Sequence, residues 1–138
     1  MSLPAFETRL FIDGAFTDAQ DGATFDVVSP LDERVLAAAA KAGAGDVDRA
    51  AQAARRAFDA GKWSGMMPTV RGVHLRRIAD AIRVNAAAIA EIETRAGGKT
   101  LANSLNEVDA AAKVFDYYAG AGDKHFGETI PMGAGILD

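Results

Sequence analysis

The sequence predicts a small antiparallel β meander followed by three or four α-helices. Turn-forming residues divide the N-terminal residues 8–40 into short β-rich stretches. Apolar residues then recur every three or four positions as far as residue 119, the spacing of one helix face. A glycine pair at 97–98 interrupts this recurrence, so the run is expected to form more than one helix.

The β-rich part is expected to contain four strands separated by turns. Asp13-Gly14 predicts a tight hairpin, because glycine tolerates the positive φ of a primed turn. Asp21-Gly22 marks a second turn and Ser29-Pro30 a third, since proline removes a donor that a strand ladder needs. The expected strands are residues 9–12, 15–17, 24–28 and 35–40.

The first helix is expected over residues 46–60. Asp46 is suited to be its N-cap, and Gly61 ends it. Trp63, in the loop that follows, is expected to cover an edge of the core. The predicted buried stripe of this helix consists of Val47, Ala50, Ala54, Ala57 and Phe58.

A long helical stretch follows from Pro68 to about Ala96. Proline is favoured in a first helical turn, and a break is expected near Val84-Asn85, where asparagine can cap a new helix. The apolar stripe of this stretch is expected to cover the meander and the 46–60 helix.

The last helix follows the glycine pair. Ser104 and Glu107 have the spacing of a capping box at its start, and Gly120 stops it. Tyr117 and Tyr118 are expected to be core residues rather than a substrate-facing pair. The stripe over residues 101–119 is expected to face parts of a larger protein.

Composition excludes several classes of function. The net charge of −4 argues against nucleic acid or an anionic membrane as a partner. The longest strongly apolar run, residues 35–40, is far too short to span a membrane. No signal peptide is apparent, so a cytoplasmic location is expected.

The residues that carry chemistry are few. The chain has no cysteine, which excludes disulfides, zinc–thiolate sites and a thiol nucleophile from these residues. His74 and His125 lie far apart and lack metal-ligand spacing. The 138 residues do not contain a complete active site by themselves.

Two glycine-containing motifs suggest phosphate binding, but their context does not support it. Gly43-Ala44-Gly45 lies between a strand and a helix, yet Asp46 and Asp48 would repel a pyrophosphate there. Gly98-Lys99-Thr100 follows a helix rather than a strand. A capped turn and a helix end with a solvated lysine are the favoured interpretations. The carboxylates spaced two apart on helices, such as Asp46 and Asp48, are expected to be solvated surface charges.

Six stretches occur in an order and at spacings that resemble one family. They are FIDGAF (11–16), TFDVVSP (24–30), DVDRAAQAARRAF (46–58), the spacing of Trp63, Pro68 and Arg71-Gly72, ETRAGGKT (93–100) and DYYAGAGDKHFGETIP (116–131). Together they resemble the N-terminal part of the NAD(P)-dependent aldehyde dehydrogenase superfamily, over about residues 8 to 138.

The resemblance implies an α/β, Rossmann-like parent enzyme. Such an oxidoreductase converts an aldehyde to a carboxylic acid through a cysteine thioester and passes hydride to NAD or NADP. In the family, the catalytic and cofactor-binding groups lie beyond the matched segment, so the segment alone should be inactive. It also implies three regions: a disordered or vector-derived N-terminus (1–7), the N-terminal part of the cofactor-binding domain (8–131) and the start of a truncated oligomerisation strand (132–138).

Two residue roles follow from the resemblance. Backbone carbonyls of Val27 and Val28 match positions that hold a structural monovalent cation, although Ala96 replaces the aspartate that completes that site. Asn106 and Ala110 match positions that look into the substrate tunnel.

The resemblance also implies partners, which are an aldehyde substrate and further copies of the chain in a homo-dimer or homo-tetramer. The alternative hypothesis is a non-enzymatic helical interaction module that pairs through its apolar stripes. A PWNFP-like stretch and a later cysteine in the downstream reading frame would favour the enzyme. A defined monomer or dimer with cooperative unfolding would favour the module.

Overall fold

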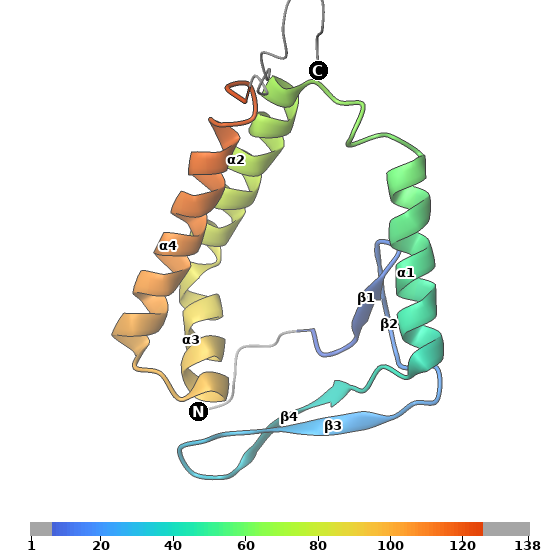
Figure 1. The fold of residues 1–138 in the computed structure, drawn as a ribbon. Helices are drawn as coiled ribbons and strands as arrows, with labels where there is room; N and C mark the ends of the chain where they lie inside the picture. Colours follow the sequence, from blue (N-terminus) through green and yellow to red (C-terminus); the bar gives the residue numbers. More distant parts are fainter. Residues whose placement is uncertain (1–6, 126–138) are drawn as a thin grey trace, which may run out of the picture.

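The computed structural model describes residues 7–125, in which four strands precede four helices (Figure 1). This order confirms the predicted fold class. The expectations for residues 1–6 and 132–138 lie outside the described residues. Within the described range, no helix is long and apolar enough to cross a bilayer. The elements are β1 (Leu10–Ile12), β2 (Ala15–Thr17), β3 (Thr24–Val28), β4 (Val35–Ala40), α1 (Ala44–Asp59), α2 (Pro68–Val84), α3 (Ala86–Gly97) and α4 (Leu101–Ala119).

The strands form two antiparallel hairpins, β1–β2 and β3–β4, rather than one continuous meander. Asp13 and Gly14 both have positive φ, of 55° and 80°, which confirms the predicted primed turn. In the loop after β2, the Gln20 N–H donates to the Asp46 carboxylate at 3.2 Å. The chain between the two hairpins is thus tied to the start of α1.

Helix α1 begins earlier than predicted and buries different residues. Its N-cap is Gly43, so the prediction that Asp46 is the N-cap is wrong. Of the expected stripe, Val47 and Phe58 are 60% and 66% exposed, whereas Ala53 is buried. The main described contact of α1 is β1, a three-residue strand that is too small to cover a whole helix face.

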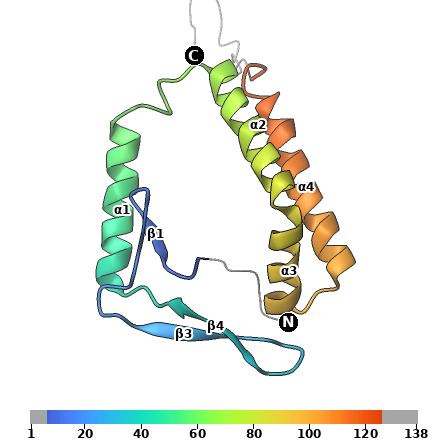
Figure 2. The ribbon, with the colours of Figure 1, turned by 180° about the vertical axis from the view of Figure 1, so that it is seen from behind.

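Helices α2 and α4 pack antiparallel along their length. A Cβ on Gly72 would lie 2.5 Å from the carbonyl oxygen of Ala119, so the two backbones nearly touch there. Ala79 and Ala112, seven residues further along each helix, are fully buried. The expectation that the α2 stripe covers the meander and α1 is wrong, because small residues on both helices make α4 its closest-fitting neighbour. Figures 1 and 2 show α1 and the β1–β2 hairpin on the opposite side of the molecule from this pair.

The helix boundaries after α2 follow the predicted breaks and one of the two predicted caps. The break occurs at Asn85, which is the N-cap residue of α3 as expected, although its side chain donates back to the Ala81 carbonyl at 2.8 Å and makes no capping hydrogen bond. Helix α4 starts at Leu101, where the Thr100 hydroxyl accepts the Asn103 N–H at 3.3 Å. The predicted capping box is wrong, because Ser104 is already inside the helix and fully buried.

We expect Gly98→Ala to destabilise the fold by more than the ~1–2 kcal/mol that a left-handed conformation alone costs an L side chain, because the new Cβ also meets Pro30. Gly98 has φ of 75°, and its Cβ would lie 2.9 Å from Cγ of Pro30. The change in the urea midpoint of unfolding measures the effect of each substitution. The control is Gly22→Ala, which has φ of 70° with no atom within 4 Å of the Cβ position. Equal effects of the two substitutions would contradict a role for the Pro30 contact.

The described core consists of small side chains, while large apolar side chains lie on the surface. Leu31, Val84 and Tyr117 are 91%, 85% and 72% exposed, and Tyr118 is also exposed. The expectation that the two tyrosines are core residues is therefore wrong within the described part of the chain. The buried apolar residues are Ala19, Ala53, Ala79, Ala90, Val108, Ala112 and Ala119.

Candidate functional site

The two residues expected to line a substrate tunnel lie on the free face of α4. Ser104 and Val108 are buried against the neighbouring helices, and each lies two positions from Asn106. Two positions correspond to about 200° around a helix, so Asn106 points to the opposite side. Ala110 is one turn further along, and both residues are exposed. Their tunnel role stays a prediction, and in the described structure the face that carries them is exposed.

The expected cation position lies at the end of β3. A bulge occurs between Val27 and Val28, which pair with residues of β4. The following turn approaches the end of α3, as the 2.9 Å distance between Pro30 and a Cβ on Gly98 shows. The end of α3 carries Ala96, which has no carboxylate. Among residues 7–125, no group of three His, Cys, Asp or Glu side chains could hold a metal. The backbone site stays a prediction.

Asp46 is a buried acceptor at the start of α1. Its side chain is 1% exposed, and its oxygens accept from the Gly43 N–H at 3.0 Å and from Nη2 of Arg49 at 2.6 Å. These hydrogen bonds, together with the one from Gln20, hold the pKa of the Asp46 carboxyl below its usual range. The expectation of a solvated charge is wrong for Asp46. The signal in the sequence was its position three residues after a glycine N-cap.

The same contacts show that the start of α1 does not fit a dinucleotide phosphate. A pyrophosphate would have to use N–H groups near Gly43 that already serve the Asp46 carboxylate. A Cβ on Gly45 would lie 2.4 Å from Oε1 of Gln20, so that side of the turn is already filled. The turn is a capped helix start, as predicted, and these residues offer no place for NAD or NADP.

Lys99 also lacks the geometry of a phosphate-binding lysine. Its Nζ lies 2.7 Å from Oε1 of Glu93 and 2.5 Å from Oε2 of Glu107. The Gly98 N–H donates to the Thr94 carbonyl, which confirms a helix end. The Lys99 side chain is 39% exposed, as expected of a solvated lysine, and it also links α3 to α4 through two carboxylates.

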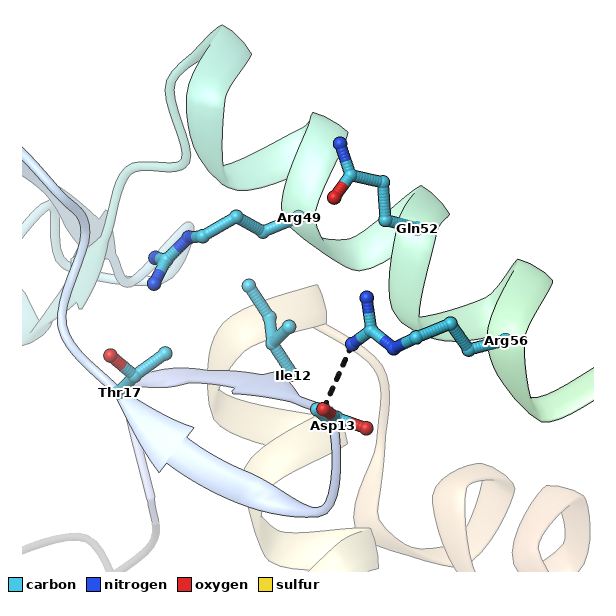
Figure 3. A pocket seen from close by; sticks show the side chains of 6 residues that line it. All are labelled: Ile12, Asp13, Thr17, Arg49, Gln52 and Arg56. Atoms are coloured by element: carbon cyan, nitrogen blue, oxygen red, sulfur yellow. Dashed lines mark hydrogen bonds and ion pairs between the residues drawn. The ribbon is translucent and has the colours of Figure 1, made fainter.

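A polar cavity of about 360 Å³ lies between the β1–β2 hairpin and α1 (Figure 3). Arg49 and Arg56 extend from α1 toward the hairpin, and Arg56 contacts Oδ2 of Asp13 at 3.0 Å. Each arginine is paired with an aspartate, Asp46 or Asp13, so these charges balance. The cavity is therefore better described as the contact region between the hairpin and α1 than as an anion-binding site. Sequence reasoning did not find it, because the pairing depends on how the hairpin docks on α1.

A second cavity of similar size is mostly apolar and lies between the loop that precedes α2 and the middle of that helix. The Trp63 and His74 rings lie 6.2 Å apart along it, and Trp63 is 47% exposed. His125 is exposed near the end of the described chain. The cavity is lined by Trp63, Met66, His74, Arg77, Ile78 and Ala81.

Comparison with known proteins gives a consistent result. Residues 16–137 match the model of the aldehyde dehydrogenase family. The betaine aldehyde dehydrogenase of Bacillus subtilis is 40% identical over 121 residues, which are 88% of this chain and 25% of that protein.

Solved structures show the same likeness. A betaine aldehyde dehydrogenase of Staphylococcus aureus, in complex with NAD+, superposes with a TM-score of 0.87 at 37% identity, over 94% of this chain and 26% of that one. An indole-3-acetaldehyde dehydrogenase in its apo form gives a TM-score of 0.90 at 36% identity, over 97% and 31%. The chain thus spans about a quarter to a third of the length of these proteins.

Proposed function

The chain belongs to the aldehyde dehydrogenase family, and on this premise we propose that it forms the N-terminal part of an oxidoreductase that converts an aldehyde to a carboxylic acid with NAD or NADP. The observation that carries the proposal is the family match over residues 16–137. The likeness to an NAD+-bound relative supports the choice of cofactor. The non-enzymatic interaction module is not favoured, because these matches run through the whole described fold.

In this proposal, residues 1–138 contribute scaffold and tunnel wall rather than reacting groups. The thioester route needs a thiolate nucleophile, and none of the 138 residues is a cysteine. The exposed large apolar side chains, such as Phe11 at 65% and Phe58 at 66%, are surfaces for the rest of the enzyme to cover. We propose a cytoplasmic homo-dimer or homo-tetramer as the working form, with the cation held by the carbonyls of Val27 and Val28.

We expect the complete polypeptide that contains these residues to reduce NAD or NADP when supplied with an aldehyde, and residues 1–138 alone to show no such activity. Both activities are measured as the absorbance of the reduced nicotinamide, with each cofactor and a panel of aldehydes. Turnover by residues 1–138 alone would contradict the proposed division of roles. No turnover by the complete polypeptide with any aldehyde would contradict the function.

We expect Ala110→Leu to select against large aldehydes by filling the tunnel. The added side chain should lower kcat/KM for a bulky aromatic aldehyde about tenfold more than for propanal, as one or two methylenes do in a tight pocket. The matched control is Ala87→Leu, which adds the same volume at an exposed position of α3. Equal effects of the two substitutions on the ratio would place Ala110 outside the tunnel.

A further inference from the structure

The junction between α3 and α4 contains a set of polar contacts that neither the proposed chemistry nor helix formation requires. Lys99 connects Glu93, on α3, with Glu107, on α4, through contacts of 2.7 Å and 2.5 Å. Each helix could form without these contacts, because Glu93 and Glu107 lie on different helices. Their effect is to fix how the two helices meet.

A partly buried hydrogen bond lies at the same junction. The Thr94 hydroxyl donates to Oγ of Ser104 at 2.9 Å, and Ser104 is fully buried. Removing one partner of such a bond leaves the other unsatisfied, so the geometry is strongly preferred. Lys99 and the Thr94–Ser104 pair both attach the first two turns of α4 to α3.

These attachments join α4 to α3 close to Asn106, which lies between Ser104 and Glu107, so they constrain the rotation of α4 about its own axis there. A helix with side chains has a radius of about 5–6 Å, so a rotation of roughly 15° displaces a side chain by roughly 1.5 Å. The far end of α4 is held separately, by the close approach of Gly72 and by the 2.5 Å contact between Arg83 and Asp116. Loosening the junction should therefore move the Asn106 end selectively.

We propose that Lys99 is a positioning residue for the aldehyde tunnel. Together with the Thr94–Ser104 hydrogen bond, it fixes the rotation of α4 and so sets how large an aldehyde the Asn106 and Ala110 face admits. This inference rests on the proposed function, and specifically on the tunnel role of α4. Hydrogen bonds to Glu107 and Glu93 raise the pKa of Lys99 to about 12. The Lys99 ammonium therefore stays charged at the pH of enzyme assays.

The experiment uses the complete enzyme and compares Lys99→Met with Lys99→Arg. For Lys99→Met we expect the ratio of kcat/KM between a bulky aromatic aldehyde and propanal to change by about fivefold, while kcat for propanal stays within about twofold, because the tunnel wall moves and the reacting groups do not. Lys99→Arg should keep the wild-type ratio, since it can still bridge the two glutamates. The control, Lys113→Met, removes a lysine that among residues 7–125 pairs only within α4, with Asp109 at 2.6 Å, and should leave the ratio unchanged.

Each outcome decides the inference. If Ala110→Leu alters the aldehyde ratio and Lys99→Met does not, the inference is wrong and the function stands. An equal loss of kcat for every aldehyde would make Lys99 merely structural and overturn the inference. If the wild-type enzyme oxidises no aldehyde, the function and the inference fail together. Should Lys99→Met not fold, Thr94→Val, compared with Thr94→Ser, provides the same test through the partly buried hydrogen bond.

Discussion

Gly72→Ala is expected to weaken the packing of α2 on α4 by about 1–3 kcal/mol, the usual cost of overfilling a closely packed contact. The new Cβ would lie 2.5 Å from the Ala119 carbonyl oxygen. Because that neighbour is backbone, it cannot move aside as a flexible side chain would. The helices must separate locally, and hydrogen exchange of α2 and α4 amides should accelerate accordingly.

Gly97→Ala is the matched control for Gly72→Ala. Gly97 is also helical, but its Cβ would meet only a side-chain oxygen of Glu93, at an ordinary 3.5 Å. Alanine has the higher helix propensity, so this change should be neutral or slightly stabilising. If Gly72→Ala behaves like Gly97→Ala, the helices are not in backbone contact at Ala119.

Asp46→Asn is expected to loosen the start of α1 and the loop after β2 together. The substitution removes the charge that accepts hydrogen bonds from Gly43, Gln20 and Arg49. Charge-assisted hydrogen bonds are among the stronger ones, and their loss leaves donors unsatisfied in a buried place. Exchange of the Gly43 and Gln20 amides should accelerate by about tenfold.

The control is Asp48→Asn, one half-turn along the same helix, where the carboxylate is exposed and bonds only to the Gln52 side chain in the described structure. Its exchange rates should stay close to those of the wild type. If both substitutions have the same effect, the burial of Asp46 does not matter, and a general helix-dipole effect explains the result.

The Asp46 interaction also predicts a dependence on pH. The folded-state pKa of Asp46 is lowered, so its stabilising contribution is fully present above the unfolded pKa, about 3.9. The contribution is lost as the pH falls through the lower folded pKa. The difference in urea midpoint between the wild type and Asp46→Asn should therefore be constant near neutrality and shrink in acid. A difference that grows in acid would contradict this account.

Local sequence signals predicted the elements well, because short-range chemistry decides them. The Asp13-Gly14 turn needs only positive φ at two residues, and the break at Asn85 needs only a looser apolar spacing. Burial was predicted less well. Asp46 looked like a surface charge and Phe58 like a core residue, because their environment depends on where the hairpin docks and on surfaces outside the described chain.

The position of the candidate site could be predicted from the sequence, but the contacts that hold its helix in place could not. Helix periodicity and the family resemblance placed Asn106 and Ala110 together on one face, and the structure leaves that face open. The role of Lys99 was missed. Glu93 and Glu107 lie six and eight positions away from it, on opposite sides of a helix break, and neither separation is the three or four positions of an ion pair within one helix.

The alanines between α2 and α4 affect how these helices can move. Alanine has no side-chain rotamers, so Ala79 and Ala112 lose no rotational freedom when they are buried. A contact built from larger side chains could repack into alternative rotamers as the helices slide, whereas this one has no alternatives to adopt. The α2–α4 contact should therefore resist sliding, which keeps the Ala119 end of α4 in place when the other end of that helix shifts.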